Sequence, residues 1–174
     1  MDFLISAKLM MTKPIDPYKY SGVWYEVASH KAGFYGLGQN DCMDTRGVYE
    51  YDSERNEIDV HTQCRHLNKR VSGINGIVKC PSTGRTCMLR FPIAPFVPHA
   101  IYRVLDTDYE SYALVEGSND KSFVQIYSRY SRPGMKFIEA QKEKLKAWGY
   151  NPDDIHITPV TFSSDPPDDQ QSML

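Results

Sequence analysis

Three residues near the middle of the chain have side chains of the kind that bind metal ions. His61, Cys64 and His66 stand within six residues of one another, and imidazole nitrogens and thiolates are preferred ligands of zinc. A zinc site needs three or four ligands that converge and are held by a supporting shell of hydrogen bonds. Side chains alternate along a β-strand, so His61 and Cys64 are expected on opposite faces. We therefore predict that this group holds no metal.

The four cysteines, Cys42, Cys64, Cys80 and Cys87, are the second group with reactive side chains. None belongs to a Cys-x-x-Cys pair, and four cysteines allow three complete pairings. A cysteine nucleophile needs a base beside it that activates the thiol. The residues alone leave two alternatives, which are disulfide bonds or four reduced and half-buried thiols.

The composition is that of one globular domain without a dominant charge. The chain has 174 residues, with 20 Lys and Arg against 22 Asp and Glu, so no net field favours nucleic acid or an anionic membrane. Aromatic residues make up 12%, including 12 Tyr, and such side chains suit a cavity that is apolar but places a few hydroxyl groups. No apolar run approaches the ~20 residues that span a bilayer. The first eight residues do not have the pattern of a signal or transit peptide.

The stretch between Gly22 and Arg129 predicts the elements that position these side chains. It is a series of short alternating segments separated by turn residues, which is typical of an all-β barrel or sandwich. The expected strands are 24–29, 43–51, 57–64, 71–80, 87–91, 101–105, 112–115 and 123–128. A glycine-rich loop at 33–39 carries the aromatic pair Phe34-Tyr35, and the prolines of 92–98 interrupt any strand there.

The periodicity changes after Pro133-Gly134 and predicts a helix that ends at Gly149. One face of this helix is apolar, and we expect it to pack on the outside of the β-structure. The apolar face consists of Met135, Ile138, Leu145 and Trp148. We expect three regions in the chain, which are an N-terminal segment (1–15), one folded domain (16–160) and a flexible acidic tail (161–174).

Three short motifs give the fold a more specific identity. Gly22-Val23-Trp24-Tyr25-Glu26 is followed far downstream by Thr107-Asp108-Tyr109 and then by Ser128-Arg129. In order and spacing they resemble the signatures of the lipocalins, which are small barrels that carry one hydrophobic molecule. The resemblance runs from about Asp16 to Pro159. It implies an eight-stranded antiparallel up-and-down barrel with a C-terminal α-helix packed on its outside.

The resemblance also assigns a structural role to the three motifs. In the family they lie at the closed end of the barrel, where the arginine packs across the tryptophan. A guanidinium stacked on an indole closes the base through a cation–π contact and takes no part in chemistry. The residues expected at this base are Gly22, Trp24, Thr107, Asp108, Tyr109 and Arg129.

The inward direction of Trp24 in the family fixes which side chains face the interior, because strand residues alternate. On the first strand this places Glu26 and Ala28 inside. The ligand contacts expected from the other strands and the glycine-rich loop are Phe34, Tyr35, Tyr49, Val60, Thr62, Ile74, Leu89, Phe91, Tyr102, Val104, Val115, Phe123 and Gln125. This mostly apolar lining would solvate a hydrocarbon or polyene and orient one polar end. The alternative is that bulky side chains fill the barrel completely.

An up-and-down barrel also favours one pairing of the cysteines. It places Cys42 beside Cys64 at one rim and Cys80 beside Cys87 at the opposite rim, so each pair closes a hairpin where a bridge is geometrically accessible. The Cys80–Cys87 register is symmetric. The Cys42–Cys64 register is one residue out, so a bulge is expected beside it.

No catalytic machinery is expected. Every cysteine lies at a rim, and Glu26 is the only acid placed inside the barrel, whereas a paired-carboxylate mechanism needs two. A buried carboxylate must be paired, and we expect Arg129 or a tyrosine hydroxyl to satisfy Glu26. We therefore predict a binding protein without cofactor or metal, and keep a lipid-modifying enzyme only as a weaker hypothesis.

Longer stretches resemble the plastid branch of the lipocalin family in plants and algae. They include 36–42, 89–92, 112–115, 123–129 and 148–152, together with the placement of the four cysteines. The resemblance implies a protein of the thylakoid lumen that protects photosynthetic membranes under light or oxidative stress. Its ligand would be a fatty acid, an oxidised lipid or a carotenoid-like pigment, and its partner a membrane-associated antenna or another large assembly. The alternative is a structural or docking subunit with a filled barrel.

Overall fold

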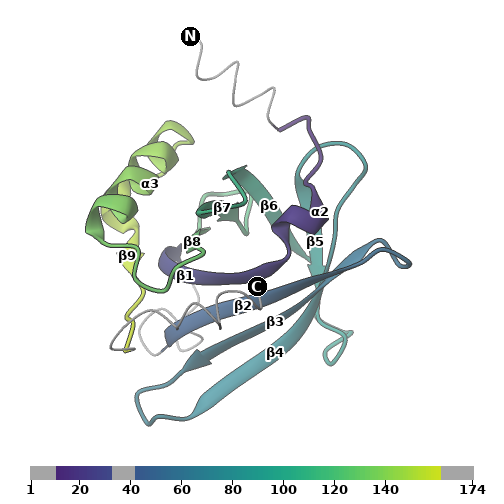
Figure 1. Cartoon of the computed structure of the whole chain (residues 1–174), viewed down its shortest axis with the longest axis horizontal. Coiled ribbons are helices and arrows are strands. Elements are labelled where there is room, and N and C mark those ends of the chain that lie inside the picture. Colours follow the sequence, from purple (N-terminus) through teal and green to yellow (C-terminus); the bar gives the residue numbers. More distant parts are fainter. Residues whose placement is uncertain (1–10, 33–41, 162–174) are drawn as a thin grey trace.

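A computed structural model describes residues 11–32 and 42–161, which form one antiparallel β-barrel with a helix on its flank (Figure 1). The strands are β1 (Gly22–Lys31), β2 (Met43–Asp52), β3 (Glu57–Arg65), β4 (Val71–Lys79), β5 (Thr86–Arg90), β6 (Ala100–Thr107), β7 (Tyr112–Glu116), β8 (Phe123–Ser128) and β9 (His156–Ile157). The helices are α2 (Pro17–Tyr20), α3 (Met135–Ala147) and the 3-10 turn η1 (Pro152–Asp154). The eight expected strands are therefore confirmed, and their ends lie within two residues of the expected ones.

Strand pairing closes the barrel. Each strand from β2 to β7 pairs antiparallel with the next one along the chain, and β1 pairs with both β8 and β2. The register from Gly22↔Tyr49 to Tyr25↔Arg46 completes the ring. The short β9 adds to the other half of β1, opposite Ala28 and Ser29. No helix among the described residues is long and apolar enough to cross a membrane.

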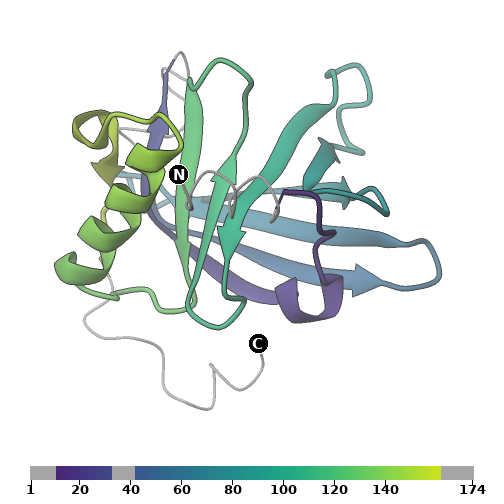
Figure 2. The ribbon, with the colours of Figure 1, turned by 90° about the horizontal axis from the view of Figure 1, so that it is seen from above.

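The molecule has two hydrophobic cores separated by the barrel wall. The interior core is built around Trp24 and a group of tyrosines. The outer core lies between α3 and the wall of β1, β7 and β8, so the expected packing of the helix is confirmed (Figure 2). Ile138 and Leu145 are buried there, but Met135 at the start of the helix is 53% exposed. The chain leaves the helix at Gly149, whose φ of 95° lies in the left-handed region that glycine tolerates.

A bulge in β1 corrects one expected orientation. The register against β8 shifts between Glu26 and Ala28, so Ala28 faces the outer core and not the interior. The extra residue at the bulge, Val27, interrupts the period of two on which the expectation rested. Glu26 stays on the interior side, opposite Tyr127.

Two disulfide bonds join the ends of hairpins, as the strand directions predicted. Cys80–Cys87 continues the register of Lys79↔Met88 at the closed end of the barrel. Cys42–Cys64 lies at the opposite end, where the β2–β3 register shifts between Met43 and Arg46. The expected bulge is therefore present, and Asp44 within it has a φ of 52°.

Candidate functional site

The interior of the barrel contains a cavity of about 250 Å³ between the tyrosine core and the open end. The expected contact residues that line it are Tyr49, Val60, Thr62, Ile74, Leu89, Phe91, Tyr102, Val115, Phe123 and Gln125. Val104 is placed differently, because it is 1% exposed and packs in the interior core outside the lining. Phe34 and Tyr35 fall outside the described residues. The side chains therefore leave the barrel partly hollow.

Four residues of the lining are absent from the expected contacts, and they are Ala100, Ile101, Gly117 and Tyr127. Two of them, Ala100 and Ile101, are neighbours in β6. Adjacent strand residues normally face opposite sides. Ala100 is on the same side of β6 as Tyr102, and it was missed because it lies one residue before the expected start of the strand. Ile101 borders the cavity although the register of β6 against β5 is regular from Leu89↔Ala100 to Thr86↔Arg103.

Hydrogen-bonded tyrosines form the floor of the cavity. The hydroxyl of Tyr102 donates to Tyr49 at 2.9 Å and lies 2.8 Å from the hydroxyl of Tyr20, while Tyr127 completes the chain through Tyr49. Burial raises the pKa of each of these four phenols. The floor is therefore uncharged at physiological pH, and its hydroxyls are satisfied by one another.

Arg129 holds the closed end together below this floor. Its guanidinium lies 3.7 Å from the centre of the Trp24 ring. It also donates to the backbone carbonyls of Tyr109, Val23, Lys19 and Ser21 at 2.9–3.0 Å. Burial lowers the pKa of Arg129 to about 10, which still leaves the group charged at neutral pH. One side chain thus ties α2, β1 and the β6–β7 turn to the end of β8.

Glu26 is the one carboxylate in the wall of the interior, among the described residues, and its partners differ from those expected. Lys31 forms an ion pair with it at 2.7 Å, and Gln125 and Thr158 donate hydrogen bonds at 2.7 and 2.8 Å. Neither Arg129 nor a tyrosine is among these partners. Burial alone would raise the pKa of Glu26, but the charge of Lys31 and these hydrogen bonds outweigh it, and the net pKa is lowered. The carboxylate is therefore held ionised and structural.

Comparisons with known proteins agree with this geometry. The family model described as "Lipocalin-like domain" matches residues 15–160. The chain is a lipocalin. It is 44% identical over 168 residues to the "Chloroplastic lipocalin" of Arabidopsis thaliana, covering 86% of this chain and 48% of that protein. It is 30% identical over 100 residues to mouse "Apolipoprotein D", covering 58% of this chain and 50% of that one. The lipocalin thus spans about half the length of these curated relatives.

Solved structures share the fold at low sequence identity. Lobster apocrustacyanin A1 superposes with a TM-score of 0.66 at 19% identity, covering 91% of this chain and 86% of that one. Insecticyanin from the tobacco hornworm Manduca sexta gives a TM-score of 0.68, also at 19% identity, covering 91% and 93%. At this level of identity the likeness establishes the barrel architecture.

Two further buried carboxylates bind the C-terminal part of the lipocalin to the barrel, and sequence reasoning did not find them. Glu116 accepts from Tyr150 after α3, and it pairs with Arg103 and Lys121. Asp44, in the β2 bulge, accepts from the backbone N–H and the hydroxyl of Thr161. No local sequence pattern predicts either contact, because Glu116 and Tyr150 are 34 residues apart in the chain and Asp44 and Thr161 are 117 residues apart.

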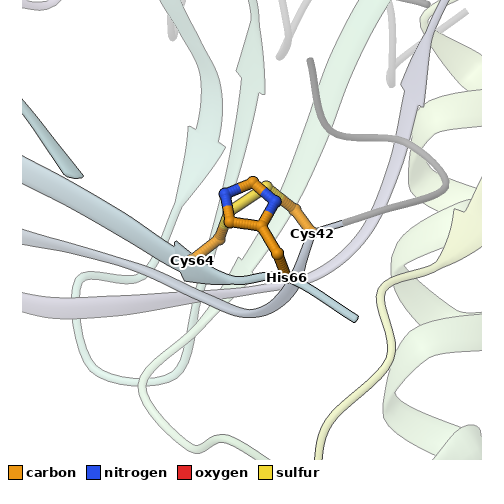
Figure 3. A group of neighbouring side chains, drawn as sticks. All are labelled: Cys42, Cys64 and His66. Carbon is orange, nitrogen blue, oxygen red and sulfur yellow. A yellow bond between two sulfur atoms is a disulfide. The ribbon is translucent and has the colours of Figure 1, made fainter. Parts of the chain in front are cut away.

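Of the three residues considered as metal ligands, Cys64 is in a disulfide bond with Cys42. Cys42, Cys64 and His66 lie within 4.8 Å of one another, with the imidazole beside the bridge (Figure 3). A disulfide sulfur has no thiolate charge to offer a metal, and His66 hydrogen-bonds to Ser72 at 2.7 Å. His61 faces away and pairs with Asn75. The arrangement is therefore suited to structural support of the rim.

A second hollow, of about 360 Å³, lies on the outer side of β2, β3 and β4. It is the larger of the two, but charged and polar groups such as Glu50, Asp59 and His61 line it. The interior cavity is the better binding site because it lies inside the barrel and is walled mostly by apolar side chains.

Proposed function

We propose that this lipocalin binds one small hydrophobic molecule inside the barrel, and carries or scavenges it. The observation that carries the proposal is the interior cavity, which has apolar walls and a floor of mutually satisfied tyrosines. Such a surface offers a hydrocarbon dispersion contacts and removes it from water, without leaving the protein's own polar groups unpaired.

The shape and polarity of the cavity narrow the ligand class. Its volume is close to the lower end of the ~300–1,000 Å³ typical of small-molecule sites, which favours a slender chain over a broad ring system. Among the polar lining residues, Thr62 and Gln125 are placed to orient a polar end group. We propose a fatty acid, an oxidised lipid or a carotenoid-like pigment.

The Arabidopsis relative, whose name places it in the chloroplast, supports a plastid location for this chain. We propose a plastid location for this lipocalin, specifically the thylakoid lumen, and a role in protecting thylakoid lipids and in photoprotection. A membrane-associated antenna is the proposed assembly partner. Catalysis is not part of the proposal, since Glu26 is ion-paired with Lys31 and Lys31 shields it from a role in proton transfer.

The first experiment is native mass spectrometry, with organic extraction, of the protein purified untreated from its own source. A lipid or pigment bound at a stoichiometry of one identifies the ligand class directly. An empty barrel that also fails to take up fatty acids or carotenoids contradicts the carrier function and favours the structural subunit.

A pair of tryptophan variants then locates the site. Ala100→Trp places an indole in the cavity lining and is expected to abolish uptake of a fluorescent fatty acid. Met88→Trp is the matched control, because Met88 is on the neighbouring strand, is absent from the cavity lining and is 39% exposed. Equal loss of uptake in both variants would place the ligand elsewhere.

A further inference from the structure

The charge of the chain is balanced overall but unevenly distributed. Between Val60 and Leu105 there is no Asp or Glu, whereas the same stretch contains seven Lys and Arg and three His. This stretch builds the end of β3, all of β4 and β5, and most of β6. Four of the seven cations pair with carboxylates from outside the stretch, and they are Arg65, Lys79, Arg90 and Arg103. Arg85 is buried, so Lys69 and Arg70 are the cations of this stretch that stay exposed without a carboxylate partner among the described residues.

The two turns that this stretch contributes to the open end carry exposed apolar side chains. The β3–β4 turn presents Leu67 and Val71, which are 72% and 52% exposed. The β5–β6 turn presents Ile93, Phe96 and Val97, which are 81%, 85% and 39% exposed. We call these five side chains the mouth tips. Isolated exposed apolar residues are ordinary, but two turns at the open end that each present several of them indicate a binding surface.

Both turns are held in place by their own backbone. In the β3–β4 turn, His66 N–H donates to Arg70 and Lys69 N–H donates to His66, both at 2.8 Å. In the β5–β6 turn, Ala94 donates to Phe91 and Val97 donates to Ala94 at 3.0 and 2.9 Å. The β3–β4 hairpin also continues past the last residue of β5, because the β4–β5 register begins only at Ile77↔Arg90 (Figure 1). The mouth tips therefore project from ordered turns.

Two cations lie among the mouth tips of the β3–β4 turn. Lys69 and Arg70 lie in the β3–β4 turn between Leu67 and Val71, and both are exposed. Neither pairs with a carboxylate within the described part of the chain. Arg65 nearby is paired with Asp44. Of the described turns at the open end, the β7–β8 turn holds the acidic Asp120, which accepts hydrogen bonds from Ser122.

We propose that the mouth tips dock this lipocalin, open end first, on a lipid bilayer that contains anionic headgroups. Protruding apolar side chains enter the boundary between headgroups and acyl chains, and neighbouring Lys and Arg side chains are attracted to anionic lipids. A bilayer fits these features better than a protein partner, because the tips are separate projections and do not form the flat, continuous core of a protein interface. Ile74, 39% exposed and also part of the cavity lining, connects the docking surface with the interior.

The test is flotation of the ligand-free protein with vesicles of phosphatidylcholine alone or of phosphatidylcholine and phosphatidylglycerol in equal parts. We expect binding to the anionic vesicles to be roughly tenfold tighter or more, and to weaken as salt screens the cations. Lys69→Glu with Arg70→Glu is expected to weaken it by at least about tenfold, and Ile93→Ser with Phe96→Ser by a similar factor. Absence of binding to the anionic vesicles overturns the proposal.

Matched controls separate docking from general effects. Lys136→Glu with Lys146→Glu makes the same charge change on α3, and Met135→Ser with Ile157→Ser removes apolar side chains that are 53% and 47% exposed. Both are expected to bind the anionic vesicles within about twofold of the unchanged protein. If the controls lose binding to the same extent as the mouth variants, the docking surface is not the mouth tips.

Two more readouts complete the test. Uptake of a fluorescent fatty acid should be unchanged in all four variants, so failure to dock and failure to bind a ligand are distinguished. If the protein binds native membranes but not vesicles made from their extracted lipids, the mouth tips recognise a membrane protein and the lipid assignment is wrong.

Discussion

The two ends of the barrel contain similar residue types in opposite environments, because cations and large apolar side chains are enclosed at the closed end and exposed at the open end. At the closed end a cation, Arg129, is enclosed by an indole and four carbonyl oxygens. At the open end, Lys69 and Arg70 are exposed, and so are large apolar side chains such as Phe96. The closed end is built for stability, because its polar groups are satisfied internally. The open end leaves its groups available to something outside the chain.

Removal of Arg129 should have the largest effect of the substitutions considered. Arg129→Ala leaves four carbonyl oxygens without their donor and uncovers Trp24, and we expect a loss of about 4 kcal/mol in the free energy of unfolding. Ligand affinity at temperatures where the variant is folded should change little. Denaturant unfolding measures the first and fluorescent fatty-acid titration the second. Unchanged stability would show that the base does not depend on this side chain.

Substitution of Glu26 tests whether a residue in the wall of the cavity also stabilises the fold. Glu26→Gln leaves Lys31 buried without its counter-charge, and we expect a loss of about 3 kcal/mol at neutral pH. The folded-state pKa of Glu26 lies below its ordinary value of 4.5. The ionised carboxylate therefore stabilises the fold above pH 4.5, and this contribution is lost as the pH falls through the lower, folded-state pKa.

The stability gap between the unchanged protein and Glu26→Gln should thus narrow on acidification. Glu50→Gln, which makes the same charge change at an exposed position of β2, is the control and should show no such gap. A gap that widens at low pH would mean that Glu26 is protonated in the folded protein.

Removing each disulfide in turn compares how much the two ends of the barrel contribute to the free energy of unfolding. Cys42–Cys64 spans 22 residues and Cys80–Cys87 spans 7. In the chain-entropy description, loss of the longer link costs about 3 kcal/mol and loss of the shorter one about 2 kcal/mol. The measurement is denaturant unfolding of the two double Cys→Ala variants. The opposite order would show that packing around the base, and not the entropy of the unfolded chain, sets the contribution of each bridge.

Substitutions at the mouth tips should have the smallest effect on folding. Ile93→Ser with Phe96→Ser removes side chains that are 81% and 85% exposed, so the free energy of unfolding should change by less than about 0.5 kcal/mol. Thermal unfolding checks this. A large loss of stability would mean that these side chains support the fold, and would remove the contrast between the two ends.

Much of the framework was predictable because it depends on local patterns. Alternation located the eight strands, and the up-and-down order that the lipocalin resemblance implied located both disulfides. The error at Ala28 shows the limit of the same rule, because one bulged residue, Val27, reverses the orientation of the next residues in β1. Most of the cavity lining was found by alternation, since the strands from β2 to β8 keep their period where they face the cavity.

The partners of the buried carboxylates were not predictable. Glu26 is satisfied by Lys31, Gln125 and Thr158, and the last of these is 132 residues away. Such contacts depend on how the C-terminal segment returns over the barrel, and no period in the sequence encodes that path. Net charge is an average over the chain, so it does not show which cations share one end of the fold.

The sequence by itself determined the strands and the helix through local periodicity and turn chemistry. Its motifs, through their resemblance to the lipocalins, supplied the barrel topology and with it the pairing of the cysteines. Tertiary structure alone decided how much of the interior stays hollow, which groups neutralise Glu26, Asp44 and Glu116, and which apolar side chains remain in water. These outcomes depend on the packing of residues far apart in the chain, where volume and hydrogen bonding are settled only when the barrel closes.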